Sequence, residues 1–281
     1  MKRACLFLSL LCAAALLGPP SAHAEAQANK PRRIASLNLC ADELLVALAD
    51  PAHIASVTYL ARDPTGSTVA EQARALPVNH GLAEEIVPLA PDLVIAGAFT
   101  TRTTVGLLKR FGIPVIELTV PTTPEEAAAQ IRQVAARIGE SERGEALAAK
   151  LEADFASLPP PPEHRPGAVV VRPNGFTAGA GSMADTLMRR AGLDNLAARH
   201  PTDRMGQWTV EEIVTARPAV LVIDGSRSAG ASLAQEVMRH PALAALDAHR
   251  ISIPGRLWAC AGPELAEAAR LLAAGAEAAG R

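Results

Sequence analysis

Two cysteines lie outside the apolar N-terminal segment of this sequence, and their positions allow three kinds of chemistry. Cys40 follows the first expected strand and Cys260 follows the last one. Because the carboxyl ends of parallel strands meet at one edge of a sheet, we expect both cysteines at the ligand-facing edges. They could form a disulfide between two halves of the protein, which requires Cα atoms about 4.4–6.8 Å apart. They could instead contact a bound metal complex as thiols, or remain unpaired and half-buried.

One histidine has neighbours that suggest ligand binding. His80 stands between Asn79 and Gly81 and could supply an axial ligand to a haem or cobalt centre, although a lone loop histidine also fits an ordinary surface position. The other histidines beyond the N-terminal segment show neither HxH nor HxxxH spacing; they are His53, His164, His200, His240 and His249. A three-histidine site for zinc or manganese is therefore poorly supported, and we expect no metal ion or other resident cofactor.

Complete catalytic motifs are absent from the sequence. It contains no P-loop, no GxSxG elbow, no HExxH and no CxxC. Residues 179–184 have GxGxxA spacing, but this spacing marks a dinucleotide site only directly after a strand, and residues 173–178 intervene. A glycine turn with Ser182 capping a helix explains the same letters. We expect no catalytic residues, and a secreted thiol-redox or dinucleotide-dependent enzyme is the alternative class.

The first 24 residues have the order of a secretory signal peptide. Lys2 and Arg3 precede an apolar run over residues 4–17, and the small-residue site Ala22-His23-Ala24 follows. The run is shorter than the roughly 20 residues that span a bilayer. We therefore predict cleavage after residue 24 and export to the periplasm, a compartment that permits disulfides.

The composition indicates a large core and argues against a nucleic-acid partner. About half of the 281 residues (49%) are hydrophobic, so disorder and a small disulfide scaffold are excluded. Lys and Arg total 27 against 29 Asp and Glu, so no basic surface is expected. Only 3% of residues are aromatic, which makes the position of each aromatic informative.

A short pattern occurs twice and indicates two related halves. Each copy begins with the letters EEIV, at Glu84 and at Glu211. A proline stands seven residues after the first glutamate, and an apolar segment that predicts a strand follows the proline. The proline ends a helix because it lacks the amide hydrogen and restricts the residue before it. A match of this length near the half-chain offset favours an internal duplication.

The remaining pattern alternates short apolar strands with helices. Strands are predicted over residues 33–37, 54–58, 93–96, 115–118, 168–171, 220–223 and 250–253. Helices are predicted over residues 41–48, 84–89, 103–111, 124–138, 182–191, 210–216, 232–239 and 263–279. This order predicts an α/β protein with two Rossmann-like three-layer (αβα) lobes and mainly parallel sheets.

One long helix is expected to join the lobes. Residues 140–158 are rich in Ala, Leu and charged residues, contain no proline and stop at four consecutive prolines. We expect a stiff helix here, either separate from the preceding helix or continuous with it, because a flexible linker would be rich in Gly and Ser. The predicted organisation is a signal peptide (1–24), an N-terminal lobe (25–139), a linking helix (140–158) and a C-terminal lobe (159–281).

The sequence resembles the periplasmic binding proteins of ABC importers for iron–siderophore complexes, haem and vitamin B12. The resemblance rests on RIASLN at residues 33–38, Glu43-Leu44, and AEEIVPLAPDLVI at residues 83–95, and it covers residues 32–275. It implies a monomeric receptor for a metal chelate and an inner-membrane permease dimer as partner. One acidic residue of each lobe docks onto permease arginines in this family, and these map to Glu84 and Glu211. A glutamate that merely favours a helix N-terminus is the structural alternative.

Most aromatic residues follow strands, where ligands bind in open parallel sheets. Such rings suit an amphipathic ligand held by stacking, although they could also plug the ends of the lobes. The expected ligand-binding residues are Tyr59, Asn79, His80, Phe99, Thr100, Arg172, Asn174, Phe176, Trp208, Arg256, Trp258, Cys40 and Cys260. Arg172 and Arg256 could pair with ligand carboxylates or form salt bridges within a lobe.

These observations together predict a periplasmic receptor rather than an enzyme. The expected ligand is a corrinoid such as cobalamin, or a ferric siderophore, with haem as the alternative in the same class.

Overall fold

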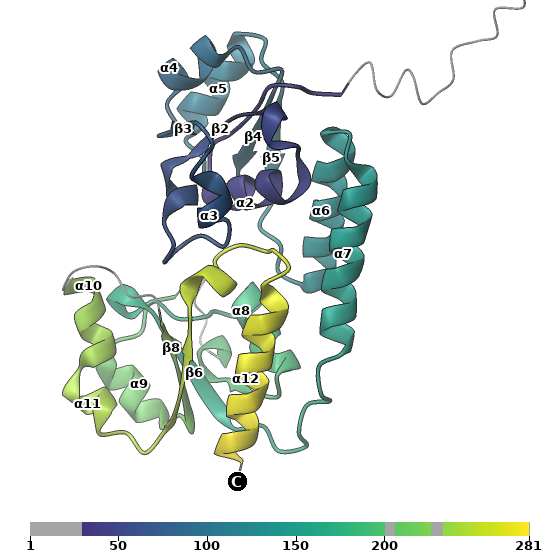
Figure 1. Cartoon of the computed structure of the whole chain (residues 1–281). Coiled ribbons are helices and arrows are strands. Elements are labelled where there is room, and N and C mark those ends of the chain that lie inside the picture. Colours follow the sequence, from purple (N-terminus) through teal and green to yellow (C-terminus); the bar gives the residue numbers. More distant parts are fainter. Residues whose placement is uncertain (1–29, 200–205, 226–232, 281) are drawn as a thin grey trace, which may run out of the picture. The chain divides into compact units, whose positions relative to one another are not determined.

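A computed structural model describes residues 30–199, 206–225 and 233–280 of the chain (Figure 1). The predicted signal peptide, residues 1–24, lies outside the described residues. Within the described residues, no helix is long and apolar enough to cross a membrane.

Two sheets, each made of parallel strands, form the centres of two lobes. The N-terminal sheet has the order β3-β2-β1-β4-β5, and the C-terminal sheet has the order β7-β6-β8-β9. Every strand pair in the described residues is parallel, which confirms the predicted fold class. The strands are β1 (Ile34–Ser36), β2 (Ile54–Thr58), β3 (Val78–Asn79), β4 (Leu93–Gly97), β5 (Val115–Leu118), β6 (Gly167–Val171), β7 (Asp194–Asn195), β8 (Val220–Asp224) and β9 (His249–Ile253).

Helices cover both faces of each sheet, so alternate residues of the strands enter different cores. In β6, Ala168 and Val170 belong to one buried cluster, while Val169 and Val171 belong to another. This is why the strands appear in the sequence as continuous apolar runs. The helices are α2 (Leu39–Leu48), α3 (Ala70–Ala73), α4 (Ala83–Ile86), α5 (Arg102–Arg110), α6 (Pro124–Arg137), α7 (Ser141–Ala156), α8 (Met183–Arg190), α9 (Val210–Ala216), α10 (Leu233–Glu236), α11 (Pro241–Ala244) and α12 (Leu265–Ala279).

The predicted strands are present, and four short elements are additional. Strands β3 and β7 have two residues each, and helices α3 and α11 have four residues each. Elements this short show no periodicity in the sequence. The helix expected over residues 232–239 is α10 followed by a turn of 3₁₀ helix; its first residue lies outside the described ranges.

The repeated sequence follows the same backbone path in both lobes. Strands β4 and β8 each begin two residues after the repeated proline. The residue before each proline, Ala90 or Arg217, has nearly the same left-handed conformation, with φ of 45° and 46°. A left-handed conformation is costly for a residue with a Cβ atom. Its recurrence at the same place in both copies supports an internal duplication.

The strand orders of the two sheets also correspond. When β1, β2, β4 and β5 are matched with β6, β7, β8 and β9, the orders agree, and only β3 lacks a counterpart in the described residues. In each sheet the order reverses between the first strand and β4 or β8. Such a reversal is the topological switch point at which open α/β sheets bind ligands.

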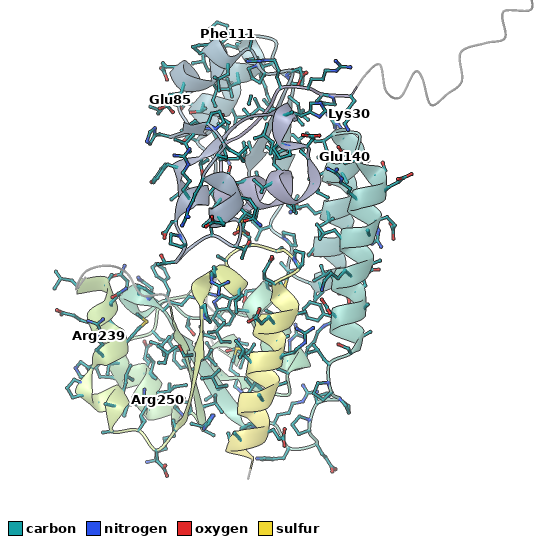
Figure 2. The ribbon with its side chains drawn as sticks, viewed as in Figure 1. Lys30, Glu85, Phe111, Glu140, Arg239 and Arg250 are labelled. Atoms are coloured by element: carbon teal, nitrogen blue, oxygen red, sulfur yellow. A yellow bond between two sulfur atoms is a disulfide. The ribbon has the colours of Figure 1, made fainter. Side chains whose placement is uncertain are left out.

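The segment predicted to link the lobes is one arm of a helical hairpin. Helix α7 occupies residues 141–156, and α6 and α7 lie side by side in Figure 1. The expectation that they are continuous is wrong, because Gly139 (φ 73°) turns the chain after α6, and Glu140 lies at the turn between the two helices (Figure 2). At Gly144 a Cβ atom would lie 2.2 Å from that of Ala135, so glycine permits this close packing. Arg132 of α6 makes ion pairs with Glu145 and Glu152 of α7 at 2.8 and 2.7 Å.

A disulfide bond joins Cys40 to Cys260, which decides among the three possibilities for these cysteines. The Cα atoms are 5.1 Å apart, and the two residues are separated by 220 positions in the sequence. Cys40 lies in the first turn of α2, after β1, and Cys260 follows β9. The bond therefore connects the ligand-facing edges of the two lobes, and neither sulfur is available as a free thiol.

Helix α2 carries two buried carboxyl groups. Asp42 accepts hydrogen bonds from the amide and the hydroxyl of Thr58, and Glu43 accepts one from the amide of Thr68 at 2.8 Å. Burial raises the pKa of Asp42 to about 6 and that of Glu43 to about 7, although the hydrogen bonds oppose the shift. The charge of Glu264, from the C-terminal lobe, raises the pKa of Glu43 further.

We predict that Glu43→Gln stabilises the protein at alkaline pH. The folded-state pKa of Glu43 lies above its ordinary value of 4.5, so its favourable contribution is complete below pH 4.5 and is lost as the pH rises through 7. Glutamine stays neutral, and the variant should gain up to about 3 kcal/mol over wild type at pH 8 but little at pH 4. Urea unfolding at both pH values measures this difference. Glu142→Gln, at an exposed position of α7, is the control and should change stability little at either pH. Equal destabilisation of Glu43→Gln at both pH values would contradict the prediction.

We also predict that removing the disulfide destabilises the protein. Replacing both cysteines by serine opens a loop of 220 residues, and loss of this constraint on the unfolded chain should cost about 2–5 kcal/mol. Urea unfolding of the double variant should match that of the reduced wild-type protein. If reduction leaves the stability of the wild-type protein unchanged, the bond makes no such contribution.

Candidate functional site

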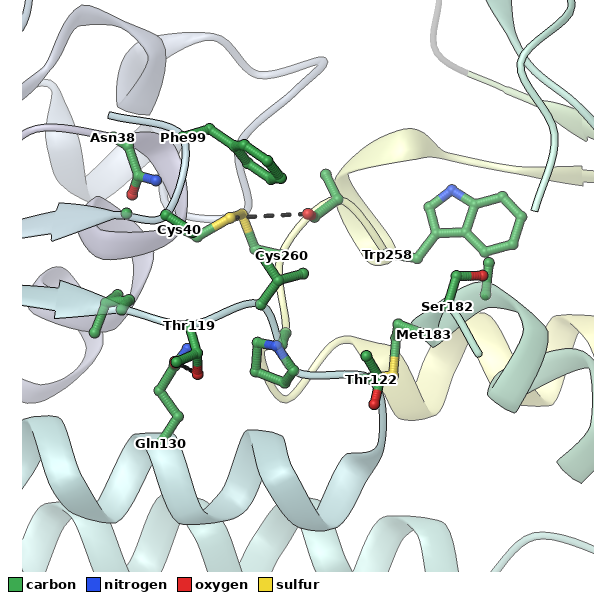
Figure 3. Close-up of a pocket in the computed structure, with 18 of the residues that line it drawn as sticks. Asn38, Cys40, Phe99, Thr119, Thr122, Gln130, Ser182, Met183, Trp258 and Cys260 are labelled. Carbon is green, nitrogen blue, oxygen red and sulfur yellow. Dashed lines mark hydrogen bonds between the residues drawn. A yellow bond between two sulfur atoms is a disulfide. The ribbon is translucent and has the colours of Figure 1, made fainter. Parts of the chain in front are cut away.

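A cavity of about 310 Å³ lies where the switch points of both sheets meet (Figure 3). Its volume is within the usual range for small-molecule sites. Asn38 and Phe99 come from the loops after β1 and β4, Thr119 from the loop after β5, and Arg172 from the loop after β6. The chain after β9 adds Trp258 and Cys260, and Cys260 is bonded to Cys40 of α2, which also lines the cavity. The cavity is thus lined from both lobes by segments that leave the carboxyl ends of strands.

Two aromatic residues, Phe99 and Trp258, belong to the lining of the cavity. Phe99, in the loop after β4, is 84% exposed, whereas Trp258 is 6% exposed. The guanidinium group of Arg172 lies 4.9 Å from the centre of the Trp258 ring, within the range of a cation–π interaction. The exposed ring of Phe99 offers a face on which an aromatic or apolar ligand group could stack.

The turn after β1 depends on a close contact between two lining residues. Asn38 caps α2 by accepting a hydrogen bond from the amide of Ala41 at 2.8 Å. A Cβ atom at Gly97 would lie 1.8 Å from Nδ2 of Asn38, so a larger residue at the end of β4 would displace the side chain that caps α2. The amide of Gly97 donates to the hydroxyl of Thr100 at 2.9 Å, which closes the next turn. Asn38 and Gly97 therefore fix the shape of the N-terminal wall.

Most other polar side chains in the lining already have partners. Thr119 donates to Gln130 at 3.2 Å, and Thr122 donates to Glu126 at 2.9 Å. Ser182 caps α8, as the sequence predicted, and β6 does not lead directly into this glycine turn. The GxGxxA spacing thus does not have the context of a dinucleotide site.

Two buried polar atoms in the lining lack a partner. They are Oγ1 of Thr177 and Nε1 of Trp258, for which the described part of the chain offers no hydrogen bond. Thr177 is 1% exposed and follows β6 closely in the sequence. Such atoms are uncommon because an unsatisfied buried polar group costs about 1–3 kcal/mol.

Of the thirteen expected binding residues, five line the cavity: Cys40, Phe99, Arg172, Trp258 and Cys260. The others lie elsewhere. Trp208 is 4% exposed and packs in the core of the C-terminal lobe against Val169 and Ile213. Asn79 is buried, and its amide donates to the carbonyl oxygen of Ser36 and to two further oxygens beside it.

Tyr59 and His80 form a separate cluster at the β2–β3 end of the N-terminal sheet. Their rings stack at a centroid distance of 5.1 Å. Glu85 accepts a hydrogen bond from the amide of His80 at 2.6 Å, and its other oxygen lies 2.8 Å from Nδ1 of the ring. The hydrogen bond from the His80 amide is the main cause of the lowered pKa of Glu85. Neither aromatic ring belongs to the lining of the cavity.

The remaining expected residues, Asn174, Phe176 and Arg256, do not belong to the lining of this cavity. Asn174 sits in a turn with φ of 59°, and its carbonyl oxygen accepts a hydrogen bond from the Gln207 side chain. Phe176, which follows in the same turn, is partly buried and pairs with Gln207 in an isolated β-bridge. The charge of Arg256 acts on Glu264 and lowers the pKa of that carboxyl group, while burial raises it more strongly.

The two predicted docking glutamates are exposed in the first turns of α4 and α9. The glutamates that follow them in the sequence have different hydrogen-bond partners. Glu85 accepts a hydrogen bond from the amide of His80, whereas Glu212 accepts one from the amide of Thr209 at 2.6 Å and completes a capping box. Within the described residues, neither Glu84 nor Glu211 has a hydrogen bond or ion pair. The equivalent carboxylate of each repeat is therefore available at the surface.

Several lining residues were not predicted from the sequence, although they too follow the carboxyl ends of strands. Asn38, Thr119 and Thr177 come shortly after β1, β5 and β6. A search of residues that follow strands, without preference for aromatic or charged types, would have included the first two. Among the described residues no group of three or more His, Cys, Asp or Glu is arranged to hold a metal ion.

Comparison with known proteins agrees with this arrangement. A curated cobalamin-binding protein of Halobacterium salinarum is 28% identical over 205 residues, which are 69% of this chain and 54% of that protein. The chain thus spans about half the length of the curated relatives it matches.

Two solved structures share the fold. The apo form of the periplasmic haem-binding protein RhuT from Roseiflexus sp. RS-1 is 24% identical with a TM-score of 0.72, covering 89% of this chain and 99% of that one. The periplasmic vitamin B12-binding protein BtuF of Vibrio cholerae is 19% identical with a TM-score of 0.69, covering 89% and 98%.

A family model describes both lobes as one unit. The model of the periplasmic binding protein family, a family of binding proteins, matches residues 34–251, from the first residue of β1 to the middle of β9. The two parallel sheets, the cavity at their switch points and this match lead to one conclusion: the chain belongs to the periplasmic binding protein family.

Proposed function

We propose that this protein is the periplasmic receptor of an ABC importer and that it binds a metal-chelate nutrient in the cavity between its lobes. The observation that carries the proposal is the placement of Phe99 and Trp258 at one cavity lined from both sheets. Flat, amphipathic chelates such as a corrinoid or haem offer a ring face for stacking and polar groups at the rim. A ferric siderophore is the third member of the proposed ligand class. The names of the related proteins support this class.

The disulfide argues against the alternative of a secreted thiol-redox enzyme. Cys40 and Cys260 lie on different lobes and do not form the closely spaced CxxC pair of such enzymes. Their bond instead holds the two walls of the cavity together at one point. Because α6 and α7 also pack as a hairpin, we expect small lobe movements on ligand binding rather than wide closure.

Export and docking complete the proposed function. The predicted signal peptide would place the mature protein in the periplasm, where it would act as a monomer. The exposed carboxylates of Glu84 and Glu211 would contact arginines of an inner-membrane permease dimer, one from each lobe. Their equivalence in the two repeats suits a partner that is itself a dimer.

Fluorescence titration tests ligand binding. Cobalamin, haem and ferric siderophores should be added to the purified protein, and at least one should quench tryptophan emission with a Kd below 1 μM, roughly the affinity expected for a specific receptor. Phe99→Ala should weaken that binding about tenfold, because it removes a stacking surface worth about 1.4 kcal/mol. Phe111→Ala removes another exposed ring, at the end of α5, and should leave affinity unchanged. If none of the chelates binds while a nicotinamide or thiol substrate is turned over, the receptor proposal is wrong.

Charge reversal tests docking. Glu84→Arg combined with Glu211→Arg should abolish chelate uptake by cells that depend on this receptor, because two steering contacts become repulsive. Ligand affinity of the purified variant should be unchanged, since both residues lie outside the cavity. Glu142→Arg, a reversal at another exposed helix start, should support normal uptake. Loss of ligand affinity in the double variant would assign the two glutamates to binding or folding instead.

A further inference from the structure

We infer that the Cys40–Cys260 disulfide is a redox switch of ligand affinity. The oxidised receptor binds the chelate tightly, and reduction of the bond by a dithiol weakens that binding. The inference rests on the proposed function and adds a chemical input to it, so that capture of the nutrient responds to the thiol–disulfide balance of the compartment. It is carried by the place of the bond, which joins the two lobes at the wall of the ligand cavity.

The position of this disulfide differs from that of a bond enclosed in a core. Cys40 is only partly buried, and both cysteines line the ligand cavity. Both also line a second cavity of about 270 Å³, whose other walls include α2, α7 and the chain before α12. Thiol–disulfide exchange requires access of a thiolate to a sulfur atom, and two neighbouring cavities provide such access in the folded protein.

The ligand contacts that the bond organises come from different lobes. Phe99 belongs to the N-terminal lobe, while Trp258 stands two residues before Cys260 in the C-terminal lobe. Figure 3 shows the bond with Phe99 on one side and Trp258 on the other. The Cα atoms of the two cysteines are 5.1 Å apart in the oxidised protein, which limits how far these rings can separate. A ligand that contacts both rings meets walls already held at one spacing, and such pre-organisation increases affinity.

Reduction leaves the lobes attached but removes this restraint. The α6–α7 hairpin contacts the N-terminal lobe, because Arg143 of α7 donates to the carbonyl oxygen of Leu48 at 3.1 Å. It also contacts the C-terminal lobe, because Arg270 of α12 pairs with Asp154 of α7 at 3.0 Å. The reduced protein therefore stays folded, while the walls of its cavity sample wider separations. Binding must then order the two walls, and this cost lowers the affinity.

The exchange reaction balances with a dithiol reductant, such as a protein with a CxxC pair. One thiolate of the reductant attacks Sγ of Cys40, the more exposed residue of the pair, and forms a mixed disulfide with it. The bond between the two protein sulfurs breaks, and Sγ of Cys260 leaves as a thiolate and takes up a proton. The second thiolate of the reductant attacks the reductant's own sulfur in the mixed disulfide, and Cys40 leaves as a thiolate that is also protonated. The protein gains two electrons and two protons, and the reductant is oxidised to its own disulfide.

The coupling between ligand and disulfide must act in both directions. If the oxidised protein binds a ligand about ten times more tightly than the reduced protein, saturating ligand favours the disulfide by the same factor. For this two-electron couple a factor of ten corresponds to about 30 mV, so the reduction potential of the bond becomes more negative by about 30 mV. A loaded receptor therefore resists reduction, and the empty receptor is the form that the reductant converts to low affinity.

Ligand affinity tests the switch with no reductant present. Cobalamin, haem and ferric siderophores are titrated into the wild-type protein and into the double variant Cys40→Ser with Cys260→Ser. Any chelate that binds the wild type should bind the double variant at least about tenfold more weakly, mainly through faster dissociation. Leu272→Ala is the control, since it removes a buried side chain of α12 outside the cavity; it should lower the melting temperature and leave affinity unchanged. Equal or tighter binding by the double variant overturns the inference.

A redox titration of the wild-type protein tests the reverse direction and needs no variant. The protein is equilibrated with mixtures of reduced and oxidised dithiothreitol, with and without a saturating ligand that this reagent leaves intact: cyanocobalamin, zinc protoporphyrin or a gallium hydroxamate. Alkylation and mass spectrometry count the free thiols, and circular dichroism reports the fold. Ligand should shift the midpoint by at least about 30 mV to more negative potential, and the empty protein should be reduced with its fold intact. An unchanged midpoint, or reduction that occurs only together with unfolding, overturns the inference.

The outcomes separate the inference from the function on which it rests. If a chelate binds the wild-type protein and the double variant equally, the disulfide is purely structural and the receptor function stands. If no chelate binds the oxidised wild-type protein, the proposed function fails and the redox switch fails with it.

Discussion

The direction of the strands is the constraint on which the rest of this structure depends. In an all-parallel sheet every strand delivers its carboxyl end to the same edge, and the helices that follow must start there. Two sheets with the same strand order therefore present two equivalent switch points, and the cavity forms where these meet. Asn38, Phe99 and Arg172 reach the cavity because they leave β1, β4 and β6, the strands that border the switch points. The strand order, rather than the type of side chain, therefore decides which residues line the cavity.

The same constraint explains how far the sequence could predict the site. Apolar runs located the longer strands, and the repeated EEIV pattern located equivalent helices, because these signals are local. Tyr59 and His80 also follow strands, but β2 and β3 lie on the outer side of the sheet, away from β4. The sequence predicts ligand binding for both Trp208 and Trp258, yet Trp208 packs in the core of the C-terminal lobe and Trp258 lines the cavity. Strand order separates these cases, and it arises from pairings between distant segments that no local pattern specifies.

Polar groups are buried in this protein in two different ways. The carboxyl groups of Asp42 and Glu43 hold the start of α2 to the last residue of β2 and to the loop before α3, and their hydrogen bonds offset part of the cost of burial. Oγ1 of Thr177 and Nε1 of Trp258 are also buried but have no hydrogen-bond partner in the described part of the chain. Local violations of good packing are commonly concentrated at functional sites, where a partner supplies what the fold omits.

The disulfide changes the topology of the chain as well as the stability of its fold. Together with the backbone from Cys40 to Cys260, it closes a covalent ring that contains most of both lobes and the α6–α7 hairpin. The residues before Cys40, which include β1, and those after Cys260, which include α12, are not part of this ring. A single break in any loop of the ring would leave one covalent molecule, with both walls of the cavity still attached to each other. A protease that cuts one of these loops would therefore not divide the protein into separate lobes.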